Sequence, residues 1–455
     1  MTGRRITGRR PLRPRPRRSS TGGTAGHGYR LDGKPAGRRA GGRPAVRVAE
    51  ADLPEELSHG PSRRFLSEQG LPAAAADLDL TALHTGRLEP LTRWEGGEVV
   101  GDGRLLVLGE TDYCGSRVVL DGVTGEVRLA ARRGATHRER TGRSLPHDPG
   151  RSDLLPSDLL ASDLTALAGL LHAAESVSQA AWRADAFGHR RGPGVVAEVI
   201  EAAERRMCAA DPQLFAADSP PPHWGTSLLM RSLCWGARPG LPGALAYEFG
   251  PDLVEELAEL DGEGRVRRYR PEEIPDRLTH EPTRRLLTEI GLPLDCELFC
   301  AFDEPLRTMV EAHPDAFDEP AEPSKRPGAA AGRAYQRDHI AVGWWPHDLV
   351  IALDGATGRL ELPEWYDEGG PAAYLNRDLS ALLYALWTYE RLRAEWRRWD
   401  CGAGRDTWQV FDPLALLHSR VDEMVKAVDP EAFRSPQHSW RLLAEDPYTG
   451  GLLSN

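Results

Sequence analysis

The strongest constraint on the fold of this chain is an internal repeat. Residues 54–72 read PEELSHGPSRRFLSEQGLP and residues 275–293 read PDRLTHEPTRRLLTEIGLP, with 11 of the 19 positions identical. Three shorter blocks match in the same order: LDGVTG at 120–125 with LDGATG at 353–358, SDLTAL at 162–167 with RDLSAL at 377–382, and DPQLF at 211–215 with DPEAF at 429–433. Blocks that keep their order indicate duplication of a whole domain. The length of 455 residues agrees, because a single hydrophobic core rarely grows beyond roughly 250 to 300 residues.

The repeat divides the chain into four parts. We predict a basic arm over residues 1–48, a first copy of the domain (copy 1) over 49–236, a linker with an acidic helix over 237–265, and a second copy (copy 2) over 266–455. The spacing between matched blocks changes by 12 and then by 18 residues. These changes predict surface insertions within 314–333 of copy 2 and within 132–151 of copy 1, where Pro, Gly and charged residues gather.

The arm is strongly basic. Residues 1–49 carry 14 Lys and Arg and one acid, Asp32, with few apolar residues, so the arm is expected to be disordered. Its twin arginines are followed by no apolar stretch, which argues against a secretory signal. A tail that binds nucleic acid and a translation start placed too far upstream both fit this composition.

Each matched block predicts local structure. The first predicts a short helix, over 62–69 and 283–290, stopped by a glycine that adopts a left-handed conformation. A strand ending in glycine follows over 104–109 and 340–343. The Asp-Gly-x-Thr-Gly block joins two apolar strands and predicts a hairpin, formed by 118–120 with 126–129 and by 350–353 with 359–362.

Two helices complete each copy. Ser162 and Asn376 are predicted as N-caps of helices whose apolar residues recur at helical spacing. A second amphipathic helix follows over 195–209 and 414–427, before the Asp-Pro block. Strands do not alternate with helices, so the pattern predicts an α+β fold with an antiparallel sheet.

Composition limits the functional classes. Residues 50–455 carry 43 Lys and Arg against 67 Asp and Glu, which disfavours phosphate backbones and favours a cationic partner; an acidic surface that only aids solubility is the simpler interpretation. The longest apolar run, 379–387, is broken by Ser380 and is too short to span a membrane, so we expect a soluble, cytoplasmic protein. Of six cysteines only Cys296 and Cys300 are close in sequence, which predicts neither disulfides nor a metal site.

The ordered motifs resemble the SUKH superfamily of immunity proteins, its fourth subfamily in particular. The resemblance covers most of residues 52–235 and 273–445; each motif is weak alone, but the ordered set occurs twice. Copy 1 departs from it where Ser162 replaces the asparagine of the helix cap and where an insertion follows the hairpin, which indicates a modified or degenerate role. In copy 2 the motifs are Leu286-Leu287 with Gly291-Leu292-Pro293, Val342-Gly343, Ile351 with Thr357-Gly358, Tyr374-Leu375-Asn376 with Asp378-Leu379, and the late Trp440.

The resemblance implies two tandem SUKH-like domains, each a central antiparallel sheet with flanking helices. It also implies a non-catalytic protein that binds and neutralises a polymorphic toxin, commonly a nuclease or deaminase, without a cofactor. The acidic body suits a toxin with a cationic active site. Signatures of zinc deaminases, P-loops, GxSxG hydrolases and HExxH metalloproteases are absent from the sequence, so the chain is not expected to be the toxin. Two alternatives stay open: a hydrolase that uses Asp354 and Glu361, and a regulatory scaffold of the same fold.

Several duplicated polar residues could be functional, but each set has a commoner structural role. The histidines could be general bases, although a packed or capping imidazole is favoured because no matched nucleophile accompanies them. The aspartates could bind a metal, but Asp-Gly in a hairpin usually bonds its own backbone. The arginines could bind an anion, but more often they cover the core or face solvent. The sets are His59 and His280, Asp121 and Asp354, and the arginine pairs 63–64 and 284–285.

The partner surface is predicted on copy 2. Trp344 and Trp345 are adjacent in a segment with a proline that copy 1 does not share, and we expect a loop there with at least one indole exposed. Trp365 and Tyr366 follow the hairpin among acidic residues. Exposed aromatic residues inside a polar rim are typical of protein interfaces, although the two tryptophans could equally cap one end of the sheet.

Overall fold

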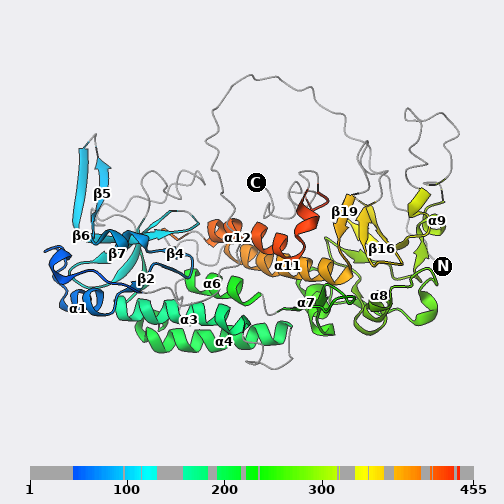
Figure 1. The fold of residues 1–455 in the computed structure, drawn as a ribbon, viewed down its shortest axis with the longest axis horizontal. Coiled ribbons are helices and arrows are strands. Elements are labelled where there is room, and N and C mark those ends of the chain that lie inside the picture. The colour runs from blue at the N-terminus through cyan, green and yellow to red at the C-terminus, as the bar shows by residue number, and fades with distance from the viewer. Residues whose placement is uncertain are drawn as a thin grey trace, which may run out of the picture. The chain divides into compact units, whose positions relative to one another are not determined.

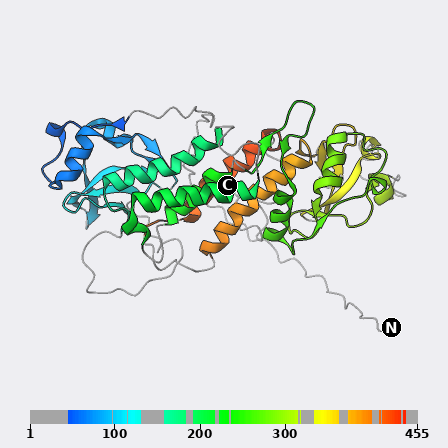
Figure 2. The same cartoon turned by 90° about the horizontal axis from the view of Figure 1, so that it is seen from below.

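The structure is a computed structural model of the chain. It describes residues 45–95, 98–113, 115–130, 157–182, 192–216, 222–233, 236–314, 317, 334–346, 348–362, 373–400, 410–411, 413–434 and 438–440. Most of the basic arm and nearly all of both predicted insertions lie outside these residues. Figures 1 and 2 show the described elements in two views.

Copy 1 is built on a seven-stranded antiparallel sheet in the order β3-β4-β6-β7-β8-β9, with β5 also paired to β6. A short ladder of β1 and β2 stands apart from it, and helices α3 and α4 run side by side (Figure 1). The elements are β1 (Ala45–Val46), η1 (Glu50–Asp52), α1 (Gly60–Glu68), β2 (Leu71–Pro72), β3 (Ala74–Ala75), β4 (Leu78–Asp79), η2 (Thr81–Thr85), β5 (Pro90–Glu95), β6 (Glu98–Thr111), β7 (Arg117–Asp121), β8 (Val127–Ala130), β9 (Ser157–Ala161), α3 (Leu164–Trp182), α4 (Pro193–Ala210), α5 (Pro212–Phe215) and α6 (Pro222–Ser232).

Copy 2 repeats this plan with a six-stranded antiparallel sheet in the order β14-β16-β17-β18-β19, with β15 also paired to β16. The preceding segment holds β10 (Arg238–Pro239), β11 (Tyr247–Glu248) and α7 (Pro251–Asp261). The elements of copy 2 are β12 (Val266–Arg267), η4 (Pro271–Glu273), α8 (Glu281–Arg285), the π-helical turn η5 (Leu286–Ile290), β13 (Leu292–Pro293), β14 (Cys300–Ala301), β15 (Arg307–Thr308), α9 (Met309–Ala312), η7 (Ala334–Gln336), β16 (Ile340–Trp345), β17 (Leu349–Leu353), β18 (Leu360–Leu362), β19 (Ala373–Asn376), α11 (Leu379–Asp400), α12 (Pro413–Val428) and η9 (Pro430–Phe433). The predicted α+β class, hairpins and paired helices are therefore confirmed.

A β-bulge interrupts the central strand of each sheet at the same place. The register of β6 to β7 shifts just before Gly109, and that of β16 to β17 shifts just before Gly343. A Cβ atom at Gly109 would lie 2.0 Å from the carbonyl oxygen of Asp79, and one at Gly343 would lie 2.5 Å from that of Cys300. The prediction that the strands end at these glycines is wrong, because the glycines admit a neighbouring strand rather than a turn.

The duplicated aspartates hold the hairpin turns by bonding their own backbone, as predicted for Asp-Gly in a hairpin. Oδ1 of Asp121 accepts hydrogen bonds from the backbone N–H groups of Val123 and Thr124, each at 2.9 Å. Oδ1 of Asp354 accepts one from Ala356 at 2.9 Å. Burial raises the pKa of both carboxyl groups, but hydrogen bonds from side chains and backbone amides outweigh it, so both pKa values lie below the ordinary value.

The duplicated histidines fasten the first helix of each copy to its hairpin. Nδ1 of His59 and of His280 each lies 2.8 Å from the hydroxyl of the residue three positions later. The rings also cover the turn, since a Cβ atom at Gly125 would lie 2.3 Å from the His59 ring and one at Gly358 2.6 Å from the His280 ring. The packed imidazole is confirmed in both copies.

One arginine of each pair ties down the loop before this helix. Nη1 of Arg63 donates to the carbonyl oxygens of Pro54 and Leu57 at 2.9 and 3.2 Å. Nη1 of Arg284 donates to the matched carbonyl oxygens of copy 2 at 3.4 and 3.0 Å. These arginines therefore serve the fold.

The predicted N-caps are wrong by one residue in copy 1 and by two in copy 2. The carboxylates of Asp163 and Asp378, rather than Ser162 and Asn376, accept the first-turn N–H groups of α3 and α11, at 2.7 Å and 3.0 Å respectively. Both residues begin the matched Asp-Leu pair, so the cap itself is duplicated. Asp, Asn and Ser are about equally good N-caps, and a carboxylate in addition complements the helix dipole.

A second buried aspartate explains what the predicted caps do. Asp211 accepts hydrogen bonds from the backbone N–H and the hydroxyl of Ser162, both at 2.7 Å. Asp429 accepts the equivalent backbone N–H of Arg377 at 2.7 Å and the amide of Asn376 at 3.2 Å. Ser162 therefore matches Arg377 rather than Asn376, and it is not the departure from the family pattern that the sequence predicts.

The two copies share polar contacts. Arg420 of α12 donates to Asp77 and Asp112 of copy 1, both at 3.4 Å. Asp158 of β9 accepts two backbone N–H groups from residues 410–411, each at 2.7 Å. The main hydrophobic cluster also contains side chains of both copies, so the duplicated domains bury part of their surface against each other.

His223 of α6 is buried beside these contacts. Its Nε2 lies 3.0 Å from the carbonyl oxygen of Ala76, and its Nδ1 lies 3.2 Å from the hydroxyl of Tyr113. Burial lowers the pKa of His223 to about 4, although Asp77 acts in the opposite direction. The imidazole is therefore neutral at pH 7. Its Nε2–H donates to the carbonyl oxygen of Ala76, and its Nδ1 accepts from the hydroxyl of Tyr113.

Candidate functional site: a pocket at the edge of the copy 2 sheet

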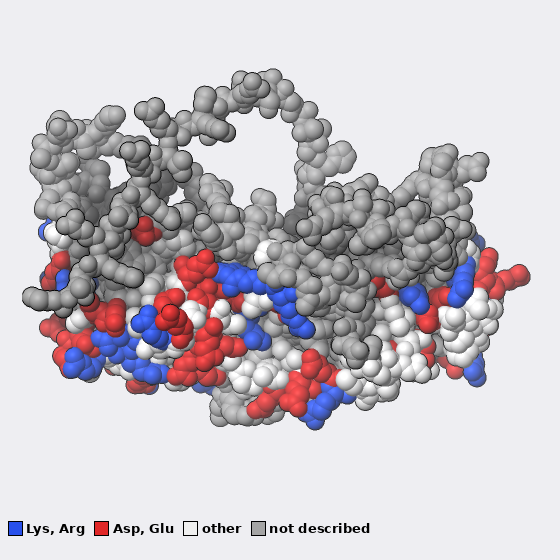
Figure 3. All heavy atoms as spheres, turned by 180° about the vertical axis from the view of Figure 1, so that it is seen from behind, with Lys and Arg blue, Asp and Glu red and all other residues white. Residues whose placement is uncertain are grey.

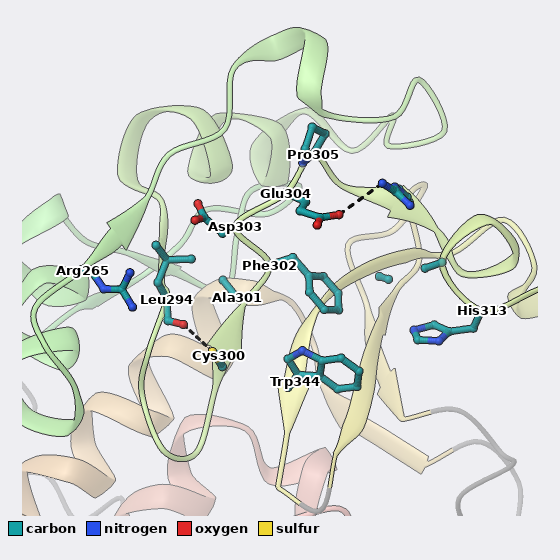
Figure 4. Close-up of a pocket in the computed structure, with 13 residues that line it drawn as sticks. Arg265, Leu294, Cys300, Ala301, Phe302, Asp303, Glu304, Pro305, His313 and Trp344 are labelled. Atoms are coloured by element: carbon teal, nitrogen blue, oxygen red, sulfur yellow. Dashed lines mark hydrogen bonds and ion pairs between the residues drawn. The ribbon is translucent and has the colours of Figure 1, made fainter. Parts of the chain in front are cut away.

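A pocket of about 540 Å³ opens at the edge of the copy 2 sheet. Its walls come from β14, β15 and β16, from the loop between β14 and β15, and from the end of α9 (Figure 4). The lining residues are Arg265, Leu294, Cys300, Ala301, Phe302, Asp303, Glu304, Pro305, Arg307, Ala312, His313, Ala341 and Trp344. The pocket therefore includes one of the four residues predicted to bind a partner.

The bulge in β16 directs Trp344 into the pocket. Side chains alternate along a strand, and Val342 points into the main core while Ala341 belongs to the cluster on the other face. Regular alternation from Val342 would send Trp344 inward, but the extra residue of the bulge moves it to the outer face. Trp345 then points inward, where it is 2 % exposed and packs edge to face on Trp440 with ring centroids 5.2 Å apart.

The predicted loop around the two tryptophans is wrong. Trp344 and Trp345 are the last two residues of β16, paired with Val350 and Leu349 of β17. Trp344 keeps 38 % of its surface exposed. Trp365 and Tyr366 lie outside the described residues, as do the acidic neighbours Glu364, Asp367 and Glu368.

Three aromatic rings form the floor of the pocket. The ring of Phe302 lies 5.4 Å from that of Trp344 at 78°, and the ring of His313 lies 6.2 Å from it at 73°. Figure 4 shows the three side chains turned toward one space. Edge-to-face packing of this kind holds the rings in fixed orientations.

His313 has an unsatisfied nitrogen in this wall. Its Nε2 is buried and has no hydrogen-bond partner within the described part of the chain. Burial lowers the pKa of His313, so the ring is neutral at pH 7. A neutral imidazole offers one N–H donor and one lone pair.

The charged groups at the rim are neutralised by one another. Each carboxylate and each guanidinium there lies within 3.5 Å of an opposite charge. Exposed ion pairs of this kind contribute little to stability, but they leave the rim without an excess of either sign. The pairs are Arg265 with Asp295 at 3.2 Å, Arg307 with Glu304 at 3.3 Å, and Arg267 with Asp303 at 3.5 Å.

The cysteines near the pocket are engaged by carbonyl groups. Sγ of Cys300 donates to the carbonyl oxygen of Leu294, and Sγ of Cys296 donates to that of Leu257. Burial raises the pKa of both thiols, so neither is a reactive thiolate at pH 7. In the described part of the chain, no group of three His, Cys, Asp or Glu side chains is arranged to hold a metal ion.

Copy 1 places different residues at the equivalent edge. Glu110 follows the bulge glycine there as Trp344 does in copy 2, and it pairs with Arg117 across the hairpin at 2.9 Å. Thr81 lies two residues after the strand partner of Glu110, as Phe302 lies two residues after the strand partner of Trp344. The two sheet edges are thus matched in backbone and unlike in chemistry.

The residues of the hydrolase alternative have structural partners. Glu361 is 6 % exposed, and its Oε2 accepts hydrogen bonds from the Tyr335 hydroxyl at 2.8 Å and the Gln336 amide at 3.0 Å. Its Oε1 pairs with Arg359 at 3.0 Å. Asp354 holds the hairpin turn as described above. Neither carboxylate lines the pocket.

Sequence reasoning missed Phe302, His313 and the rim arginines. The repeat offers a signal for Phe302. The first matched block is displaced by 221 residues between the copies, and the same displacement aligns the apolar Phe302 with the polar Thr81. His313 gives no such signal, because it stands next to the predicted insertion and has no matched residue in copy 1.

The fold defines a duplicated α+β domain, and comparison with known families identifies it. Residues 31–230 and 253–446 each match the SUKH-4 immunity protein family. The chain belongs to this family and carries two of its domains in tandem, the second match including most of α7. No curated protein and no solved structure matches the chain.

Membership of this family implies an immunity function directed against a toxin. Within the described residues, none of the helices combines the length and apolar character needed to cross a membrane.

Proposed function

We propose that the protein neutralises a polymorphic toxin of the nuclease or deaminase type by binding it in the cytoplasm, without catalysing a reaction. The observation that carries the proposal is a partly exposed tryptophan over a pocket in a domain of an immunity family. Occlusion of a toxin requires a surface and no catalytic groups, which agrees with the structural roles of Asp354 and Glu361.

The toxin-binding surface centres on Trp344. A rigid indole next to a pocket buries a large area when a partner docks, and such residues dominate binding energies at interfaces. Trp345 supports this surface only indirectly, because it is part of the core. We place Trp365 and Tyr366 in the same surface as a proposal from their position after the hairpin.

The net charge supports a cationic toxin. The excess of acids over bases in residues 50–455 attracts a basic protein over distances comparable to the Debye length and accelerates association. On the face shown in Figure 3, acidic and basic side chains alternate. The electrostatic attraction is therefore expected to act on any basic protein, and the pocket is expected to provide the specific recognition of the toxin.

The test is co-purification of the full chain with toxin domains encoded beside its gene. Truncation of Trp344 to alanine is expected to weaken toxin binding about 30-fold, which corresponds to about 2 kcal/mol for an aromatic residue at the centre of an interface. Leu241→Ala is the matched control, because Leu241 is 71 % exposed and is not part of the pocket.

Unchanged affinity of a folded Trp344→Ala protein would contradict the placement of the surface. Failure to bind or inhibit any neighbouring toxin, together with a measurable turnover lost in Asp354→Asn, would contradict the function and favour the hydrolase. A deletion phenotype in cells that lack such toxins would favour the scaffold.

A further inference from the structure

We propose that the pocket at the copy 2 edge receives one apolar side chain of the partner, of the size of leucine or phenylalanine, against Trp344 and Phe302. This inference rests on the proposed function, since it names the chemistry of the group that the toxin inserts. Three observations carry it: a row of side chains that is charged in copy 1 and apolar in copy 2, the aromatic wall of the pocket, and the paired charges of its rim.

The same row across three neighbouring strands has opposite chemistry in the two copies. Residues directly opposite one another on antiparallel strands have their side chains on one face of the sheet. In copy 1 every member of the row carries a charge, and in copy 2 none does. The rows are Asp79, Glu110 and Arg117 in copy 1, and Cys300, Trp344 and Val350 in copy 2.

Copy 1 shows that this framework does not require apolar residues here. Glu110 and Arg117 pair at 2.9 Å with more than a third of each side chain exposed, so this part of the copy 1 sheet faces water. In copy 2 the matched position leaves 38 % of Trp344 exposed, next to a half-buried Phe302. Because exposed apolar surface costs free energy that the fold does not demand, it indicates a face that a partner covers.

The part of the pocket wall that meets an occupant is apolar. Figure 4 shows Trp344 and Phe302 turned toward one space, and a volume of about 540 Å³ lies within the range of pockets that enclose small ligands, roughly 300 to 1,000 Å³. Sγ of Cys300 already donates to the carbonyl oxygen of Leu294, and Nε2 of His313 is buried and out of reach. An inserted side chain therefore binds through contact with the rings rather than through hydrogen bonds.

The rim disfavours a charged occupant. Asp303 and Glu304, two carboxylates that line the pocket, are paired with Arg267 and Arg307. An inserted lysine, arginine or carboxylate would lose hydration without meeting an unpaired opposite charge. The acidic body attracts a cationic toxin as a whole, whereas the residue that enters the pocket is neutral and apolar.

The experiment titrates the full chain with amino-acid amides and follows binding by saturation-transfer NMR of the probe signals. The apolar probes are N-acetyl-L-leucinamide and N-acetyl-L-phenylalaninamide. The polar probes are N-acetyl-L-asparaginamide, which is close to the leucine amide in shape, and N-acetyl-L-argininamide. We expect the better apolar probe to bind with a Kd on the order of 1 mM, at least about ten-fold more tightly than either polar probe.

Two variants install residues that the copy 1 framework already holds at the matched positions. Trp344→Glu is expected to abolish binding of both apolar probes, and Phe302→Thr is expected to weaken it about five-fold, because each removes a ring from the wall. Leu241→Ala, outside the pocket, should leave all affinities unchanged. Circular dichroism spectra matching that of the unaltered protein show that each variant is folded.

The outcomes separate this inference from the proposed function. Equal or tighter binding of a polar probe, no binding of either apolar probe, or unchanged affinity in folded Trp344→Glu would overturn the inference, and the proposed function stands if the toxin domain still co-purifies. Probe binding that a bound toxin domain leaves unchanged would also overturn it, because the toxin then docks elsewhere. Absence of toxin binding, with the apolar probes bound as expected, would contradict the proposed function and support the apolar preference of the pocket.

Discussion

In copy 1 the position after the bulge glycine carries Glu110, and in copy 2 the same position carries Trp344. The surrounding framework is alike, because both copies keep the bulge, the hairpin aspartate, the histidine on the turn and the buried aspartate behind the helix. Charged side chains are depleted at the centres of protein interfaces, whereas a partly exposed indole favours association. The duplicated residues therefore maintain the fold, whereas the proposed binding surface lies at positions where the copies differ.

The largest effect is expected from the shared aspartate behind the first long helix. Asp211→Ala and Asp429→Ala should each lower the free energy of unfolding by about 3 kcal/mol, because several buried donors lose their acceptor. Urea unfolding followed by circular dichroism measures the loss. A loss below about 1 kcal/mol in either copy would show that the matched aspartate does not stabilise both domains in the same way.

A second difference between the copies is sensitive to pH. The offset that aligns Trp224 with Trp440 aligns His223 of copy 1 with Ser439 of copy 2. Because the pKa of His223 is about 4 in the folded protein against 6.5 ordinarily, the folded state binds fewer protons between these values. The contribution of His223 to stability is complete above pH 6.5 and falls as the pH decreases to 4, by on the order of 3 kcal/mol.

Urea unfolding at several pH values tests this contribution. His223→Gln retains hydrogen-bonding groups and does not titrate, so its stability should depend less on pH than that of the unaltered chain. His313 and His339 also have pKa values lowered by burial and remain in both proteins. Equal slopes for the two proteins between pH 4 and 6.5 would contradict the assignment to His223.

The bulge glycines are expected to have an intermediate effect. Gly343→Ala and Gly109→Ala should each destabilise the fold by about 2 kcal/mol, because the added methyl group meets a backbone carbonyl of the neighbouring strand. Gly343→Ala should also weaken toxin binding by displacing Trp344, whereas Gly109→Ala should not. Thermal unfolding and toxin titration together separate these effects. Equal toxin affinities for both variants would contradict the hypothesis that only the copy 2 pocket binds the toxin.

The smallest effect is expected at the ion pair of Glu110 in copy 1. Glu110→Ala removes an ion pair with Arg117 whose side chains are 42 % and 39 % exposed, so the free energy of unfolding should change by no more than about 0.5 kcal/mol. Toxin affinity, measured by calorimetry, should not change. A ten-fold loss of affinity would place copy 1 in the toxin interface and break the comparison.

The duplicated fold could be predicted because matched residues specify local structure. The Asp-Gly-x-Thr-Gly turn is closed by its own aspartate, and the helices are visible from the spacing of leucines that pack on one side. The helix caps were misplaced by one or two residues, since Ser162 and Asn376 are themselves good caps by type. Only the fold shows that they bind Asp211 and Asp429, which are 49 and 53 residues away in sequence.

The sequence by itself determined the two α+β domains, their order and the presence of unmatched tryptophans in copy 2. Tertiary structure decided which tryptophan is available. From the local sequence pattern, Trp344 and Trp345 are equally good candidates for an exposed side chain. The bulge before Gly343 reverses the alternation of β16 and buries Trp345 against Trp440. Tertiary structure also places Phe302 and His313 beside Trp344, because β14 and α9 reach that part of the sheet only through pairing and packing between residues distant in the chain.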